Sequence, residues 1–429
     1  MATVRPFHAL RYQVERFADP AILLAPPYDV IDAAQQQALY EREPHNVIRL
    51  EYGTTQPDDT PERNRYTRAA ETLQAWLADG TLTMEANASF YPHEQRYTWE
   101  DQHRFRRGFF AAVRLASFDA GEVLPHEETL KGPKADRMKL MRHCLASFSP
   151  VFGLYDGRHS ALGELLERAT AGAPVMTASG YDFDDRLWRT DDPGLTAAIS
   201  AELQKRQILI ADGHHRYETT LALRDQLRRE YPDAPEHAAF NYVFMLLVDL
   251  NDPGLLVLPT HRLLRLGPEM KAAFCRVAGT NFTMEKILPA NPEVIIALLH
   301  RHRDEHAFVW YANGTFSLLT SAKTLRNGLP VLDVTALQER VFDPLFALDI
   351  EGHASVEENI SYTHHPADAV AAVDRGEVDA AIFLNPTPIH DVLTLATAGI
   401  RLPQKSTYFY PKVPTGLVMH NLRPDVTVG

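Results

Sequence analysis

The 429-residue sequence predicts a mixed α/β (α+β) protein, because short apolar strand patterns and amphipathic helix patterns follow one another along the whole chain. Hydrophobic residues make up 45% and charged residues 23% of the sequence, which is typical of soluble globular domains. A chain of this length forms two or three domains rather than one. We expect an N-terminal α/β part over 1–115, a central core over 116–260 and a C-terminal α/β domain over 261–429.

The first elements are short. Leu23–Ala25 and Val47–Leu50 have the apolar character of strands. Thr60 and Pro61 form an N-cap and first-position pair, which predicts a helix that ends before Gly80. Residues 89–99 and 105–118 read as paired strands around a polar turn at 100–103.

The remaining elements alternate in type. Strands are expected at 151–155, 208–210, 242–249 and 379–384, and helices at 133–147, 160–170, 194–205, 214–230, 291–303, 366–376 and 388–398. Asn313-Gly314 predicts a two-residue hairpin turn between strands 307–311 and 315–320. The tail after Pro403 is expected to be a loop followed by a strand.

The charge balance excludes some partners. With 43 Lys+Arg against 56 Asp+Glu the formal net charge is −13, which opposes binding to DNA or to an anionic membrane surface. The apolar runs are too short to cross a bilayer. Cys144 and Cys275 are far apart in the sequence, which suits a reducing cytoplasm rather than a disulfide framework. We therefore expect a cytoplasmic protein with no DNA or membrane partner.

The segment 207–221 is the strongest functional signal. A strand that turns through Asp212-Gly213 into a helix starting at His214 presents a helix N-terminus, which favours an anion such as phosphate. Gly213 lets a ligand approach the backbone, and His214, His215 and Arg216 place polar groups on the first turn. In a purely structural alternative, Asp212 caps the helix and His215 and Arg216 are solvated. Since the dipole contributes only about 0.3–1 kcal/mol, further basic groups or a metal must converge on this turn.

A second candidate segment is 126–137. Glu127 and Glu128 supply carboxylates, and the basic residues Lys131, Lys134 and Arg137 follow within one loop and helix start, beside Thr129. Phosphoryl transfer needs a carboxylate that takes a hydroxyl proton or holds Mg²⁺, and cations that neutralise developing charge. The alternative is an ordinary solvated loop.

The third candidate is the loop with Lys405, Ser406 and Thr407, which would close over a ligand; the alternative is a packed tail. Asp29, after a rigid Pro-Pro turn, would line a cleft. The sequence contains no HExxH, no Walker GxxxxGK[ST] and no GxSxG motif, so zincin, P-loop and serine hydrolase chemistry have no support. Adjacent His364 and His365 point apart and are poor joint metal ligands.

Three motifs in order, HEETLKGPKADR, IADGHHRYET and PQKSTYFYPK, resemble a bacterial family known only as domain-of-unknown-function family 1015, over almost the whole chain. The DGHHRY element is also similar to the nucleotide-binding motif of the ParB/sulfiredoxin superfamily, over roughly residues 110–250. Within that superfamily it most resembles the SerK-type kinases, which phosphorylate free serine. This resemblance implies a ParB/sulfiredoxin-like nucleotide-binding core with additional N- and C-terminal α/β parts.

The departures from these families are informative. Sulfiredoxins carry Gly-Cys-His-Arg, and here His214 stands where their reactive cysteine would be, which rules out sulfinic-acid reduction. ParB-like proteins are basic DNA clamps, whereas this chain is acidic. The match to SerK-type kinases includes DGHHR and an upstream glutamate that acts as base, here Glu127 or Glu128. The acceptor can differ, because those kinases lack the large N- and C-terminal parts.

We therefore expect a nucleotide-dependent kinase that uses ATP or ADP with Mg²⁺ to phosphorylate the hydroxyl of a small molecule, free L-serine or a similar amino acid. The expected catalytic residues are Glu127, Glu128, Asp212 and His215. The expected nucleotide-binding residues are Gly213, His214, His215, Arg216, Thr129, Lys131, Lys134 and Arg137. The alternative is a ParB-like regulatory switch that binds or hydrolyses a nucleotide and acts on a protein or nucleic-acid partner. Metal ligands and oligomeric state stay open.

Overall fold

The computed structural model describes residues 1–429 except 129–131, 181–182, 289–290 and 348–358. The chain forms two compact units. Unit 1 comprises Met1–Pro125, Thr129–Leu256 and Pro411–Gly429, and unit 2 comprises His126–Glu128 and Val257–Tyr410. Unit 1 therefore combines the N-terminal part, most of the central segment and the end of the chain. Strands and helices are mixed in both units, which confirms the predicted mixed α/β class.

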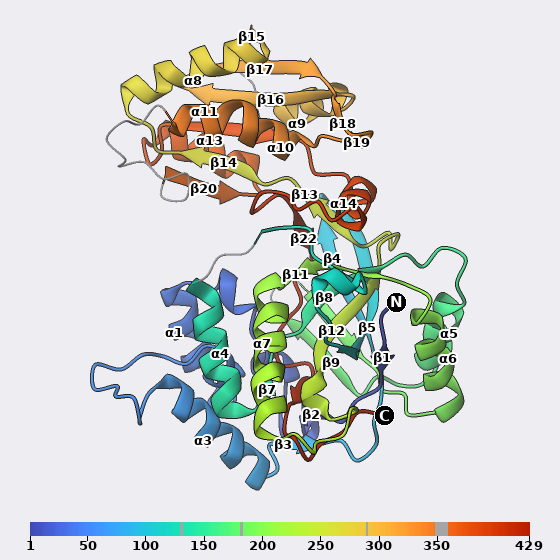
Figure 1. Ribbon diagram of the computed structural model, residues 1–429. Helices are drawn as coiled ribbons and strands as arrows, with labels where there is room; N and C mark the ends of the chain where they lie inside the picture. The colour runs from blue at the N-terminus through green and yellow to red at the C-terminus, as the bar shows by residue number, and fades with distance from the viewer. Residues whose placement is uncertain (129–131, 181–182, 289–290, 348–358) are drawn as a thin grey trace. The chain divides into compact units, whose positions relative to one another are not determined.

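Unit 1 is built on a nine-stranded sheet with the order β6-β11-β8-β12-β5-β4-β10-β9, and β1 pairs with β5 (Figure 1). The strands are β1 Val4–Arg5, β4 Tyr91–Trp99, β5 Gln102–Arg114, β6 Val123–Leu124, β8 Val151–Tyr155, β9 Met176–Gly180, β10 Phe183–Leu187, β11 Ile208–Asp212 and β12 Tyr242–Asp249. β8 is parallel to β12 and β6 to β11, and the other pairs are antiparallel. The predicted hairpin of β4 and β5 is present, and its turn residues Glu100 and Asp101 both have positive φ.

A smaller sheet in unit 1 joins distant parts of the chain in the order β3-β2-β23-β7. Its strands are β2 Ala9–Tyr12, β3 Leu82–Met84, β7 Ala146–Ser147 and β23 Met419–Asn421. Because β23 pairs with both β2 and β7, the end of the chain is held against its beginning and its middle.

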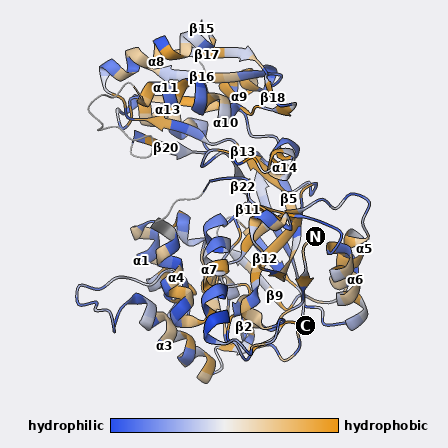
Figure 2. Cartoon of the chain, in the orientation of Figure 1, coloured by the Kyte–Doolittle hydropathy of each residue, from blue (hydrophilic) through white to orange (hydrophobic). Residues whose placement is uncertain are grey.

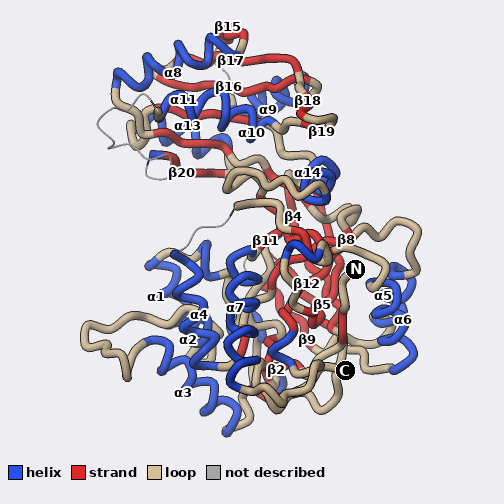
Figure 3. The backbone as a smooth tube through the Cα atoms, in the orientation of Figure 1, coloured by secondary structure: helices blue, strands red, loops and turns tan. Residues whose placement is uncertain are grey.

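The helices of unit 1 lie on both sides of the large sheet (Figure 3). They are α1 Ala33–Arg42, α2 Ile48–Glu51, α3 Arg65–Ala78, α4 Gly132–Cys144, α5 Leu162–Ala169, α6 Pro193–Leu203 and α7 His214–Glu230. α5 and α6 cover one face, where Leu165 and Ile199 pack with Phe109 and Met245 of the strands. α4 packs against α7 on the other side. The apolar colouring of β5 and β12 in Figure 2 marks the core between these layers.

Unit 2 contains a six-stranded sheet with the order β15-β17-β16-β21-β14-β20. Its strands are β14 His261–Leu264, β15 Thr283–Ile287, β16 Glu305–Ala312, β17 Thr315–Ala322, β20 Ile360–Thr363 and β21 Ala380–Leu384. Its helices include α8 Pro268–Asn281, α9 Pro292–Arg301, α10 Asp333–Leu337, α11 Asp343–Phe346, α13 Pro366–Asp374 and α14 Ile389–Thr397. The predicted turn is present between β16 and β17, with φ of 49° at Asn313 and 70° at Gly314.

Two further strand pairs are short. β13 Leu256–Leu258 pairs with β22 Tyr408–Tyr410, and β18 Leu325–Arg326 pairs with β19 Leu329–Pro330. Within the ranges that the structure describes, no helix is both long enough and apolar enough to cross a membrane.

Three sequence predictions near the N-terminus are wrong. Val47–Leu50 is not a strand but belongs to α2, because the Asn46 side chain accepts a hydrogen bond from the Ile48 N–H at 2.9 Å and starts a helical turn. Leu23–Ala25 is not a strand either, since Pro20–Leu23 forms a 3₁₀ turn. The helix predicted to begin at Thr60 begins at Arg65, where Asn64 accepts from the first-turn N–H groups.

Candidate functional site

The turn between β11 and α7 forms the structural centre of the strongest sequence motif. Gly213 has φ 92° and ψ 30°, in the left-handed region that glycine adopts without strain. It is the N-cap of the 17-residue helix α7, and no side chain caps that helix through a hydrogen bond. The alternative in which Asp212 caps the helix is therefore not realised. The positive end of the α7 dipole lies at this turn and favours an anion.

The Asp212 carboxylate instead holds two cations. Its Oδ1 atom accepts a hydrogen bond from the Lys412 ammonium at 2.8 Å, and its Oδ2 atom accepts one from the Arg216 guanidinium. The side chains of Lys412 and Arg216 are only 15% and 10% exposed. Burial opposes the charge on Asp212, but Lys412 and Arg216 outweigh it and lower the pKa of Asp212 well below its usual range. Two cations thus converge on Asp212 beside the start of α7, and the carboxylates of Asp29 and Glu51 also act electrostatically on Arg216.

Gly213 is also required by the packing of Arg216. A Cβ atom built on Gly213 would lie 2.9 Å from Arg216 Nε and 3.0 Å from its Cζ, because the guanidinium crosses over the glycine. Arg216 reaches further and donates to the Pro150 carbonyl oxygen. The space that a missing side chain was expected to leave for a ligand at Gly213 is therefore filled by Arg216 itself.

This packing predicts the effect of adding a methyl group. Gly213→Ala should lower the free energy of unfolding by about 1–2 kcal/mol, since alanine is strained at positive φ and Arg216 must shift. Gly163→Ala is the matched control, because Gly163 lies in α5 with no heavy atom within 4 Å of a built Cβ, and alanine favours a helix. Urea denaturation should show the two substitutions acting in opposite directions. If both substitutions changed the free energy of unfolding equally, neither the backbone conformation nor the packing at Gly213 would require glycine.

The buried charges continue from Arg216 to the N-terminal part of unit 1. The Arg137 guanidinium lies 4.0 Å from the centre of the Tyr28 ring, and its Nη1 atom donates to the carbonyl and carboxylate oxygens of Glu51 at 3.0 Å each. Burial raises the pKa of Tyr28 to about 12 although Arg216 and Arg137 lower it, so this phenol is neutral at pH 7. Sequence reasoning found Arg137 but missed Glu51, which no motif marks.

The other basic residue of the second motif also lies near α7. Lys134 in α4 forms an ion pair with Glu218 in α7 at 2.6 Å. His214 is buried, with 7% of its surface exposed, while His215 is half-buried and its carbonyl oxygen accepts from the Thr219 hydroxyl at 2.6 Å. Unit 1 thus contains Asp212–Arg216, Lys134 and Arg137, and Lys412 joins Asp212 there.

Glu127 takes part in a different cluster, in unit 2. Its Oε1 atom accepts hydrogen bonds from the backbone N–H groups of Ser406 at 2.9 Å and Thr407 at 3.1 Å, and from the Thr407 hydroxyl at 3.3 Å. His126 Nε2 lies 2.8 Å from the same hydroxyl. The second and third sequence motifs therefore meet, and Glu127 fixes the 405–407 loop.

The remaining predicted residues are exposed or not described. Glu128 and Lys405 are exposed, and Lys405 has a positive φ of 57°. Buried Arg262 approaches the Lys405 carbonyl oxygen at 3.5 Å and was not found from the sequence. Thr129 and Lys131 lie outside the described residues. Among the residues with described positions, no group of three His, Cys, Asp or Glu side chains could hold a metal ion.

Comparison with known proteins identifies the family. Residues 4–339 match the family described as protein of unknown function (DUF1015). The chain belongs to this family. The family match confirms the resemblance that the three motifs indicate, and no curated protein matches the chain.

Several solved structures share a weaker similarity. A conserved hypothetical protein from Pyrococcus furiosus is 15% identical with a TM-score of 0.37, and the match covers 72% of this chain and 95% of that one. A free serine kinase in complex with AMP is 15% identical with a TM-score of 0.38, covering 72% and 92% of the two chains. A free serine kinase complex with ADP gives 13% identity and a TM-score of 0.37 at the same coverage.

Proposed function

We propose that unit 1 binds the phosphates of a nucleotide, ATP or ADP, at the start of α7. The observation that carries this proposal is the arrangement of Lys412 and Arg216 on the single carboxylate of Asp212, beside a helix start that no side chain caps. The positive charges of Lys412 and Arg216 and the helix dipole act in the same direction on an anion. Together they supply the converging cations that the dipole alone lacks.

We propose further that the bound nucleotide serves phosphoryl transfer to the hydroxyl of a small molecule, free L-serine or a similar amino acid. The DGHHR motif at 212–216 and the upstream glutamates support this proposal. In the transfer, the bond from the terminal phosphorus to the nucleotide oxygen breaks and a bond to the substrate hydroxyl oxygen forms. The hydroxyl proton passes to a carboxylate, for which we propose Glu127. Asp212 holds Arg216 and Lys412 in place for the phosphates, and His215 lies on the same first turn of α7.

Mg²⁺ belongs to this proposal as an ion carried by the nucleotide phosphates, which neutralises their charge. Such an ion needs only one or two protein carboxylates, so it is compatible with the described residues, which lack a three-ligand cluster. The two cysteines, Cys144 and Cys275, are both free, and we propose a cytoplasmic location.

The direct test is a product assay. Purified protein with Mg²⁺, ATP or ADP, and L-serine should yield phosphoserine, detected by mass spectrometry, and omission of serine should abolish it. Other hydroxyl amino acids serve as parallel acceptors. Nucleotide hydrolysis that no hydroxyl compound affects would contradict the kinase proposal and favour the regulatory switch.

A further inference from the structure

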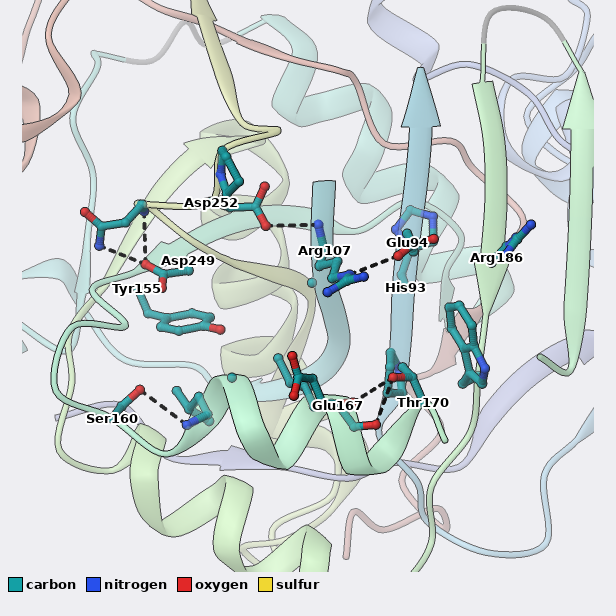
Figure 4. A pocket seen from close by; sticks show the side chains of 18 of the residues that line it. His93, Glu94, Arg107, Tyr155, Ser160, Glu167, Thr170, Arg186, Asp249 and Asp252 are labelled. Carbon is teal, nitrogen blue, oxygen red and sulfur yellow. Dashed lines mark hydrogen bonds and ion pairs between the residues drawn. The ribbon is translucent and has the colours of Figure 1, made fainter. Parts of the chain in front are cut away.

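A cavity of about 540 Å³ lies within unit 1, between α5 and the large sheet (Figure 4). Its lining includes Arg96, Arg107 and Arg186 from the strands, and Leu166 from α5. Its volume falls in the range of small-molecule sites. None of the sequence motifs and none of the predicted site residues contributes to it.

The cavity is separate from the proposed nucleotide site. Asp212 pairs with Phe152 near the start of β8, whereas the cavity is lined by Tyr155 at the end of β8 and by Asp249 at the end of β12. Three residues of strand correspond to about 10 Å. The two sites therefore lie toward opposite ends of β8 and share no residue.

Charged side chains form a row across neighbouring strands at this cavity. In the register of the sheet, Arg107 on β5 is opposite Glu94 on β4, and Glu94 is opposite Arg186 on β10. Glu94 accepts from Arg96 Nε at 2.7 Å and from Arg107 Nε at 2.9 Å. Burial opposes the charge of Glu94, but the two guanidiniums outweigh it and lower the pKa of Glu94. Glu94 thus stays ionised and holds both arginines at the cavity.

The arginines keep unused donor groups. The Arg186 side chain makes no hydrogen bond or ion pair within the described part of the chain, and Arg96 and Arg107 use only their Nε atoms toward Glu94. Each guanidinium has five N–H donors in a planar fork that matches a carboxylate or phosphate group. The part of the cavity lined by β4, β5 and β10 therefore has three guanidiniums and one lining carboxylate, Glu94, whereas Asp249 of β12 lines another part.

The other carboxylates of the cavity accept hydrogen bonds from backbone N–H groups or are exposed to solvent. Asp249 Oδ1 accepts from the backbone N–H groups of Gly157 and Asn251 at 3.0 Å each. Asp252 accepts from the backbone N–H groups of Gly254 at 2.8 Å and Arg107 at 3.2 Å. Glu167 on α5 is exposed. Figure 4 shows Asp249 and Asp252 on the side of Arg107 away from Glu94 and Arg186. The cavity is thus polar at both ends, and the guanidinium donors that Glu94 does not use are at the arginine end.

An apolar wall completes the cavity. Leu162 and Leu166 of α5 and the Trp188 ring line it, and the Trp188 indole N–H donates to the Gly172 carbonyl oxygen at 2.9 Å. A cavity with an aromatic and aliphatic wall and a few converging polar groups is typical of small-molecule binding.

We propose that this cavity binds a small organic anion. A carboxylate or phosphate group of the ligand contacts the guanidiniums of Arg107 and Arg186, and its apolar body packs on Leu166 and Trp188. Guanidinium groups bind a carboxylate and a phosphate group in the same way. The test therefore uses ligands of both kinds to tell which one the cavity binds.

The test is titration calorimetry of the full-length protein with benzoate, phenyl phosphate, inorganic phosphate and the cation benzylamine. At least one aromatic anion should bind and change the fluorescence of Trp188, and benzylamine should not bind. Arg186→Ala and Arg107→Ala should each weaken anion binding at least about tenfold, as expected for a charge-assisted contact. Arg168→Ala, an exposed arginine of α5 outside the cavity, should leave binding unchanged.

Arg186→Ala is the more stringent variant, because Arg186 has no partner whose loss would unfold the protein. Lys412→Met should not affect binding in the cavity, which separates this proposal from the nucleotide site. The proposal is overturned if neither aromatic anion binds at concentrations up to about 10 mM, where even weak sites fill. Binding that survives Arg186→Ala, or that Lys412→Met abolishes, would equally overturn it.

Discussion

Arg216→Met should lower the free energy of unfolding by about 3 kcal/mol, at the lower end of the range for removing one partner of a buried ion pair. The guanidinium is 10% exposed, contacts Asp212 and donates to the Pro150 carbonyl oxygen, so its removal leaves both groups short of a partner. Lys412 still neutralises Asp212, which limits the loss. Urea denaturation at pH 7 measures the effect.

Two further variants are needed to interpret the effect of Arg216→Met. Arg216→Lys keeps the charge but loses the planar fork, so an intermediate loss of stability is expected. Arg229→Met changes the same residue type on an exposed position of α7 and should stay within about 0.5 kcal/mol of the unmodified protein. If Arg216→Met were as stable as Arg229→Met, the buried cluster would not hold the start of α7.

Glu127→Gln should lower turnover about 10²–10⁴-fold while nucleotide binding is kept, which is the usual scale for a general base. Glutamine retains a carbonyl oxygen that can accept from the backbone N–H groups of Ser406 and Thr407, so the loop at 405–407 should stay in place. Steady-state phosphoserine formation measures turnover, and calorimetry measures nucleotide binding.

The neighbouring glutamate is the control. Glu128 is exposed, and Glu128→Gln should be fully active. Full activity of Glu127→Gln with an inactive Glu128→Gln would assign the base to Glu128. If both variants were active, neither glutamate would take the proton. Glu127→Ala, which loses the contacts to Ser406 and Thr407, reports how much of Glu127's effect comes from holding that loop.

The parts of the fold that sequence predicted well are those fixed by local physics. The apolar run at 208–210, the glycine at 213 and the helical pattern after it predict β11, the turn and α7, because each depends on adjacent residues. The same holds for the Asn313-Gly314 turn, whose two residues adopt positive φ. The strand predicted at Val47–Leu50 does not form, because this run has no strand partner there. The Asn46 side chain starts a helical turn instead.

Only part of the candidate site could be predicted from the sequence. The motif residues Asp212 and Arg216 stand out in the sequence, but their partner Lys412 is 200 positions after Asp212, and only the folded chain brings it to the carboxylate. The contact of Glu127 with Ser406 and Thr407 is equally remote. Lys412, Ser406 and Thr407 all belong to the segment 403–412, part of which was predicted to be a ligand-binding loop. The sequence therefore showed which residue types are present there, but not which residues they contact.

The most direct test of the central claim is nucleotide titration calorimetry on the unmodified protein, Lys412→Met and Lys205→Met. Lys412 contacts Asp212 beside the start of α7, whereas Lys205 is 65% exposed and pairs with Glu202. We predict that ATP or ADP binds the unmodified protein, that Lys412→Met weakens binding at least about tenfold, and that Lys205→Met does not change it. Absence of nucleotide binding, or equal affinity in Lys412→Met and the unmodified protein, would contradict a phosphate site at the start of α7.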